Sequence, residues 1–194
     1  GIDKMSEWIF DILKVENIEK IHIVGVSLGA VLAQDFANRY SNLVRSLACF
    51  GGYDINNFDI KMQKENGAKQ MLMMLKAVFS IKWFAKANKK ISAYTSQAQD
   101  EFFDMNKLFP KKSFMFLTTL NSMVNKYKTG KRNYPLLIGC GSFDIPMELE
   151  AIKQWKINEP NCRVVIFENA GHCANMDVPQ EFNETMEDFW TSAE

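Results

Sequence analysis

Residues Gly25–Gly29 read G-V-S-L-G, a G-x-S-x-G pattern centred on Ser27. The pattern falls between a β-branched run at 21–26, typical of a buried strand, and apolar residues recurring at helical spacing over 28–36. A serine in such a turn is held in a strained conformation, and its hydroxyl is lifted clear of the sheet. Glycines at 25 and 29 would let strand and helix approach closely, and the helix N-terminus favours negative charge developing at Ser27. The setting predicts a nucleophile; the alternative is a chance match in a glycine-containing turn.

A serine nucleophile needs a general base, and the chain has only two histidines. His22 lies inside the expected strand at 21–26, and we interpret it as a structural residue of a packed layer. His172 follows an expected strand at 164–167, at the edge where parallel α/β sheets place their active sites. An isolated loop histidine is usually a surface residue, but His172 is the suitable partner for Ser27 and is predicted to be the base.

A catalytic histidine needs a carboxylate that fixes its tautomer and stabilises the imidazolium. Asp144 follows an expected strand at 135–140 and so reaches the same edge of the sheet. Because Pro146 follows closely, a helix-capping or turn role is the alternative for Asp144. Asp177 lies five residues beyond His172, and we interpret it as a helix-capping residue rather than the acid.

Strands and helices alternate in the segments that must position these residues. An amphipathic helix carrying Met5, Trp8, Ile9, Ile12 and Leu13 is expected before the first strand. The other expected strands and helices follow in order: strands at 44–50, 135–140 and 164–167, and helices at 28–36, 149–155 and 182–190. This alternation predicts parallel βαβ units and hence an α/β fold.

Residues 53–133 break the alternation, and we expect no strand there. Amphipathic helices are predicted over 71–79 and 116–124, with less regular helical stretches near Trp83 and Phe103. The segment is rich in Met and Phe, whose side chains are expected to pack the segment's own core and to form part of an apolar pocket.

Charge divides along the same boundaries. Residues 53–133 carry 15 basic and 6 acidic residues, whereas the remainder carries 8 basic and 17 acidic ones. We therefore predict a core made of 1–52 and 134–194, with a basic helical cap at 53–133. The lysines are expected on solvated helix faces, or alternatively as a surface that attracts anionic substrates or membranes.

The order Ser27, Asp144, His172 resembles that of the α/β-hydrolase superfamily. Three motifs carry the resemblance: G-V-S-L-G-A at 25–30, G-S-F-D at 141–144 and A-G-H at 170–172. The resemblance implies an α/β-hydrolase fold, with a mostly parallel sheet flanked by helices and an all-helical cap inserted between strands. It also implies a triad of Ser27, Asp144 and His172, and an oxyanion donor in the backbone N–H of Leu28.

The chain departs from the family pattern before Ser27, where one helix alone precedes the expected strand. The family's first four strands, and the loop that supplies its second oxyanion donor, have no counterpart in the sequence. We therefore expect the C-terminal part of a longer capped hydrolase, with the strand at 21–26 on the edge of the sheet.

Composition excludes several classes of protein. A formal net charge of zero argues against a general nucleic-acid binder, and no apolar stretch approaches the ~18 residues of a membrane span. The four cysteines show no CxxC spacing, so we expect reduced thiols and a cytoplasmic location. No metal-ligand spacing and no GxGxxG pattern after a strand is present, so no metal or cofactor is expected.

These observations predict a serine hydrolase that cleaves a carboxylic ester or related acyl compound with an apolar portion, through an acyl-enzyme. The substrate would be a small molecule. Two alternatives remain open: a C–C or amide-bond hydrolase with the same triad, and a non-catalytic interaction protein that keeps the hydrolase fold.

Overall fold

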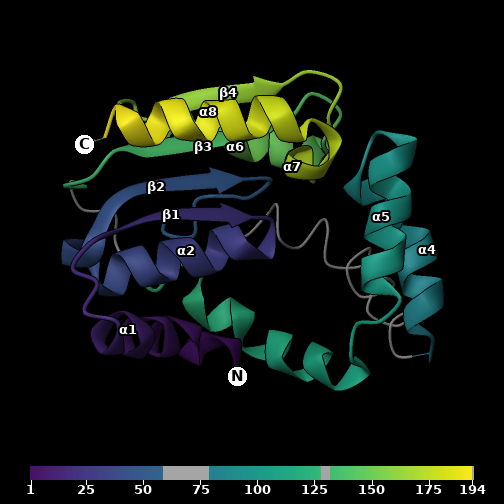
Figure 1. The fold of residues 1–194 in the computed structure, drawn as a ribbon, viewed down its shortest axis with the longest axis horizontal. Helices are drawn as coiled ribbons and strands as arrows, with labels where there is room; N and C mark the ends of the chain where they lie inside the picture. Colours follow the sequence, from purple (N-terminus) through teal and green to yellow (C-terminus); the bar gives the residue numbers. More distant parts are fainter. Residues whose placement is uncertain (59–78, 128–131, 194) are drawn as a thin grey trace.

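Four parallel strands form one sheet in the order β1-β2-β3-β4. The computed structural model describes residues 1–58, 79–127 and 132–193. The strands are β1 (Ile21–Val26), β2 (Val44–Phe50), β3 (Leu136–Gly141) and β4 (Arg163–Phe167). The arrows of β1, β2 and β4 point the same way in Figure 1, and β3 pairs in parallel with β2 and β4, so the four carboxyl ends meet at one edge. The predicted α/β class and all four predicted strands are confirmed.

Helices cover both faces of the sheet. The helices outside 53–133 are η1 (Ile2–Lys4), α1 (Met5–Val15), α2 (Leu28–Arg39), η2 (Ser41–Leu43), α6 (Pro146–Asn158), α7 (Ala174–Asp177) and α8 (Pro179–Thr191). α2 and α6 pack on one face through Phe36 and Trp155, while α8 packs on the other through Phe182 and Phe189. The sheet is therefore the middle of three layers.

Strand β2 shows how the sequence builds these layers, because successive side chains point to opposite faces. Leu47 and Cys49 pack towards α2 and α6, whereas Ala48 and Phe50 pack towards α8. All four are fully buried, as expected for a parallel strand covered on both sides.

Strand β1 lies at the end of the sheet and pairs only with β2 among the described residues. Val24 on β1 is 37% exposed, and Trp8 and Ile12 on α1 are 53% and 60% exposed. The expectation of a buried strand is therefore wrong for Val24, whereas the expected position of this strand at the edge of the sheet agrees with its pairing. α1 packs against α2 through Leu13, Ile9 and Phe10, while Trp8 and Ile12 remain exposed.

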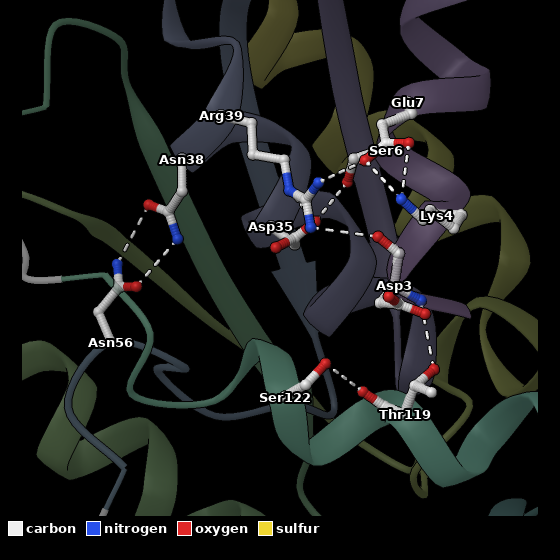
Figure 2. Close-up of polar contacts among 10 residues, drawn as sticks. All are labelled: Asp3, Lys4, Ser6, Glu7, Asp35, Asn38, Arg39, Asn56, Thr119 and Ser122. Atoms are coloured by element: carbon white, nitrogen blue, oxygen red, sulfur yellow. Dashed lines mark hydrogen bonds and ion pairs between the residues drawn. The ribbon is translucent and has the colours of Figure 1, made fainter. Parts of the chain in front are cut away.

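A buried polar cluster holds α1 against α2 (Figure 2). Asp35 on α2 is fully buried, accepts a hydrogen bond from the Ser6 hydroxyl at 2.6 Å, and forms an ion pair with Arg39 at 2.8 Å. Arg39 also donates to Glu7 at 3.3 Å and to the carbonyl oxygen of Asp3 at 3.1 Å. One arginine thus links the start of the described chain to the helix that follows Ser27.

Only helices are present in the described part of 53–133: α4 (Ile81–Ser92), α5 (Ser96–Asn106) and η3 (Lys111–Met123). The helices expected near Trp83 and Phe103 are confirmed, whereas the one expected over 116–124 is a 3₁₀ helix that begins earlier. The helix expected over 71–79 lies, except for Phe79, outside the described residues. α4 and α5 lie beyond the tips of the strands in Figure 1. The division into core and cap stays a prediction.

No helix in the described part of the chain is long and apolar enough to cross a membrane. The four cysteines are free thiols: Cys49, Cys140 and Cys162 are buried, and Cys173 is partly exposed.

Candidate active site

Ser27 occupies the tight turn between β1 and α2 and has a backbone φ of 56° with ψ of −121°. This is an uncommon conformation for a residue with a side chain, and such strain is often found at active sites. The turn is held by the Ser27 N–H, which donates to the carbonyl oxygen of Phe50 at 2.8 Å. A Cβ atom on Gly25 would lie 2.3 Å from the carbonyl oxygen of Gly29, so residue 25 must be glycine for the helix to approach.

The expected packing role of Gly29 is wrong. A Cβ atom there would meet no atom within 4 Å, apart from the backbone of its own helix. Gly29 instead lines an open apolar groove beside the edge strand, together with Ile21, Ile23 and Leu32.

The structure brings Ser27, His172 and Asp144 together in one chain of hydrogen bonds. The Nε2 atom of His172 lies 2.7 Å from the Ser27 hydroxyl oxygen, and its Nδ1 atom lies 2.9 Å from Oδ1 of Asp144. These residues follow three different strands, β1, β4 and β3, and meet because parallel strands end at a common edge. Both imidazole nitrogens are occupied, as required of a base that takes a proton from serine while a carboxylate fixes its tautomer.

Asp144 is buried, with 4% of its surface exposed. Its Oδ1 atom accepts a second hydrogen bond, from the N–H of Ile145 at 2.7 Å. α6 begins after Ile145 and has no side-chain cap, so the alternative role of Asp144 as its N-cap is not adopted. The carboxylate therefore faces the imidazole and not the helix end.

Two glycines that the sequence reasoning did not assign to the site make room for the histidine loop. Gly51 has φ of +54°, and a Cβ atom there would lie 2.9 Å from the carbonyl oxygen and 3.0 Å from Nδ1 of His172. A Cβ atom on Gly141 would lie 2.1 Å from the carbonyl oxygen of Ala170. The signal was visible for Gly51, since a Gly-Gly pair ends strand β2, but its partner lies 121 positions away along the chain.

The environment of His172 acts on its protonation in two directions. Burial favours the neutral imidazole, but the hydrogen bond and the charge of Asp144, with a contribution from Glu148, outweigh it and raise the pKa above 6.5. The imidazole is therefore a stronger base than a free histidine.

Glu148 is a further titratable residue beside the site that sequence reasoning missed. It lies in the first turn of α6, is 4% exposed, and its Oε2 atom makes no hydrogen bond with any described residue. Burial raises its pKa to about 7; the charge of His172 lowers it and that of Asp144 raises it further. A neutral Glu148 avoids placing a second buried negative charge next to Asp144.

Leu28 is the first residue of α2, directly after Ser27. The first four N–H groups of an α-helix have no partner within the helix and carry the positive end of its dipole. The position of Leu28 thus fits the predicted oxyanion donor, a role that remains a prediction.

The other two polar candidates have different surroundings. His22 on β1 lies 2.7 Å from the Ser46 hydroxyl of the neighbouring strand, in agreement with a structural role. The helix-capping role expected for Asp177 is wrong, since α8 begins after Val178 and has no side-chain cap. The described residues contain no group of three or more His, Cys, Asp or Glu that could hold a metal ion.

Comparisons with solved structures place this arrangement in a known fold. An esterase from Exiguobacterium antarcticum superimposes with a TM-score of 0.82 at 16% identity, covering 98% of this chain and 74% of the esterase. A carboxylesterase of the thaumarchaeon Nitrososphaera gargenis gives 0.78 at 16% identity, covering 99% and 72%. A meta-cleavage product hydrolase from Pseudomonas fluorescens gives 0.72 at 19% identity, covering 100% and 73%.

No protein-family model and no curated protein sequence matches the chain. At these identities, structural similarity establishes the fold. The chain has the α/β-hydrolase fold, as the three motifs predicted.

Proposed function

We propose that this chain is a serine hydrolase in which Ser27 is the nucleophile, His172 the general base and Asp144 the residue that orients the base. The observation that carries the proposal is the continuous hydrogen-bonded chain from the Ser27 hydroxyl through both nitrogens of His172 to Asp144. The strained backbone of Ser27 at the start of α2 supports it independently.

The first half of the reaction forms an acyl-enzyme. The Ser27 oxygen attacks the substrate carbonyl carbon while its proton passes to Nε2 of His172, and the carbonyl π electrons move onto the oxygen. The N–H of Leu28 would donate to this oxyanion. When the intermediate collapses, the bond to the leaving group breaks and His172 returns the proton to that group.

The second half repeats these steps with water. His172 takes a proton from water, the hydroxide oxygen attacks the acyl carbon, and Ser27 leaves with the proton that His172 returns. Asp144 stays ionised and stabilises the imidazolium formed in each half.

A carboxylic ester with an apolar portion is the substrate class we propose. Two of the three structural neighbours described above are esterases by name. An aromatic pair lies next to the triad in sequence and space: Phe143, which precedes Asp144, stacks on Tyr94 with ring centroids 4.1 Å apart. Both rings are about half exposed and give an apolar surface for an acyl or alkyl group.

The decisive experiment is covalent labelling with a fluorophosphonate, followed by peptide mass spectrometry to locate the adduct. We expect an adduct on Ser27 in the wild type and none in Ser27→Ala, with labelling strongly slowed in His172→Ala. His22→Ala is the matched control, because it removes the other histidine, which bonds to Ser46. A folded wild type without a Ser27 adduct would refute the enzyme and favour the non-catalytic interaction protein.

A panel of substrates separates the bond types. We expect turnover of aryl and alkyl esters to exceed that of matched amides and of substrates cleaved at a C–C bond. The meta-cleavage product hydrolase among the neighbours makes C–C cleavage the alternative to test, and preferential C–C cleavage would replace the ester proposal. For either bond, kcat/KM should rise with pH through the pKa of His172, which lies above 6.5.

A further inference from the structure

The carboxylate of Asp177 connects two segments that are more than 70 positions apart in sequence. Its Oδ2 atom accepts from the N–H of Gly171 at 2.8 Å, directly before His172. Its Oδ1 atom accepts from the N–H and the hydroxyl of Thr95, at 2.7 and 2.8 Å. The N–H of Tyr94 lies 3.0–3.1 Å from both oxygens.

The same two segments touch through their backbones on either side of this carboxylate. The N–H of Cys173 donates to the carbonyl oxygen of Ser92 at 2.7 Å. A Cβ atom on Gly171 would lie 3.0 Å from the nitrogen of Tyr94, so the approach is tight. The junction between α4 and α5, at 92–95, therefore packs directly against the loop that carries His172, consistent with the position of α5 beside α7 in Figure 1.

We propose that Asp177 is a positioning residue that uses the α4–α5 junction to hold the His172 loop in register with Ser27. The proposal rests on the proposed function of Ser27 and His172. Asp177 does not touch the reacting atoms: it orders Gly171, and Gly171 places the imidazole that follows it. The helical insertion thereby contributes to the base as well as to the substrate surface.

Hydrogen-bond chemistry favours a carboxyl group with two accepting oxygens at this position. The donors that converge on Asp177 are the N–H groups of Gly171, Tyr94 and Thr95 and the Thr95 hydroxyl, and a carboxylate accepts with both oxygens. An asparagine has one oxygen, so its NH₂ group would face an N–H donor on one side. Asp177→Asn keeps the shape but loses the hydrogen bonds that one of the two carboxylate oxygens accepts, and so weakens the connection between the two segments.

The test compares Asp177→Asn with Asp188→Asn in the whole 194-residue chain. Asp188 is also an aspartate of the C-terminal segment, but it is exposed and pairs with Arg163 on the surface. We expect Asp177→Asn to lower kcat for an ester roughly 10²-fold with little change in KM, because displacement of a catalytic group slows chemistry more than binding. Asp188→Asn should match the wild type. Rates are taken per folded molecule, with the folded fraction measured by circular dichroism.

Two readouts do not depend on turnover. Hydrogen exchange at the amides of Gly171, Tyr94 and Thr95 should speed up in Asp177→Asn and not in Asp188→Asn. The NMR titration of the His172 ring, assigned against His172→Ala, should shift towards that of an ordinary histidine as its contact with Asp144 loosens. If the wild type forms no fluorophosphonate adduct on Ser27, the proposed function fails. The positioning contact is still supported in that case if Asp177→Asn shows faster amide exchange and a shifted His172 titration.

Thr95 provides a second test if Asp177→Asn does not fold. Thr95→Val removes one donor to Asp177, and Thr95→Ser restores the hydroxyl. We expect a smaller fall in kcat for the valine variant and recovery in the serine variant. The proposal would be overturned if folded Asp177→Asn, or Thr95→Val, kept the wild-type values of three quantities. These are kcat, the rate of amide hydrogen exchange and the NMR titration of His172.

Discussion

Asp35 and Asp144 are both buried aspartates, and they differ in the partner that each one faces. Asp35 on α2 contacts Arg39 at 2.8 Å and the Ser6 hydroxyl at 2.6 Å (Figure 2). Asp144, after β3, contacts Nδ1 of His172 at 2.9 Å. The relative exposures are 0% and 4%, so burial does not distinguish them.

The partner decides what each carboxylate can do. The arginine guanidinium keeps its proton at any ordinary pH, so Asp35 and Arg39 form a fixed ion pair within α2. Asp35 then contacts Ser6 of α1, and Arg39 contacts Glu7 of α1. An imidazole gains and loses a proton near neutral pH, and the second nitrogen of His172 reaches Ser27 at 2.7 Å. The same side chain thus stabilises helix packing in one place and, in the proposed function, stabilises the imidazolium formed by proton transfer in the other.

The largest expected effect comes from Asp144→Asn. Without the carboxylate, His172 loses the partner that fixes its tautomer, and kcat/KM for an ester should fall roughly 10⁴-fold. Stability should change little because the amide retains the shape. Steady-state kinetics and thermal melting measure the two quantities, and a loss of less than about tenfold would remove Asp144 from the triad.

Asp35→Ala should affect stability instead. It removes the buried carboxylate that Arg39 and the Ser6 hydroxyl contact, and leaves Arg39 with the partly exposed Glu7 as its ion-pair partner, which should cost about 1.5–3 kcal/mol of unfolding free energy. Urea unfolding measures this, and kcat per folded molecule should stay at the wild-type value. Asp11→Ala on the exposed face of α1 is the control. If kcat of folded Asp35→Ala fell as much as that of Asp144→Asn, the two aspartates would not have the different roles described above.

Glu148→Gln sharpens the comparison with a third buried carboxyl group. The folded-state pKa of Glu148 is about 7, above the ordinary 4.5, because burial disfavours its charge. Below about pH 4.5 the group is protonated in both folded and unfolded states; as pH rises towards 7 the unfolded state loses the proton first, and stability falls by roughly 3 kcal/mol. Glutamine cannot ionise, so the variant should gain stability over the wild type across this range.

Urea unfolding at several pH values from 4 to 8 measures that gain. Glu150→Gln, an exposed neighbour on the same helix, should show no comparable change. A stability difference that shrinks as pH rises would contradict the pKa of Glu148.

Sequence periodicity predicted the four strands and most helices, because burial on one or both faces imposes a regular spacing of apolar residues. It also predicted α1, but Trp8 and Ile12 on its apolar side are 53% and 60% exposed among the described residues. The spacing of apolar residues shows which side of a helix is apolar and carries no information on what packs there.

The part of the candidate site that depends on local sequence patterns could be predicted. Ser27, Asp144 and His172 each follow a strand, and that context is local. Asp177 was interpreted as a helix cap, also from local context, yet its carboxylate contacts residues more than 80 positions earlier. No short pattern surrounding Asp177 signals that contact.

By itself, the sequence determined the class of fold and the types of residue at the edge where the strands end, since apolar spacing and the G-x-S-x-G turn are local properties of the chain. Only the tertiary structure decided which buried carboxylate faces an arginine and which an imidazole, and that Asp177 joins the α4–α5 junction to the histidine loop. Those outcomes depend on distances between segments that are remote in sequence. They are set when the strands align and their carboxyl ends meet.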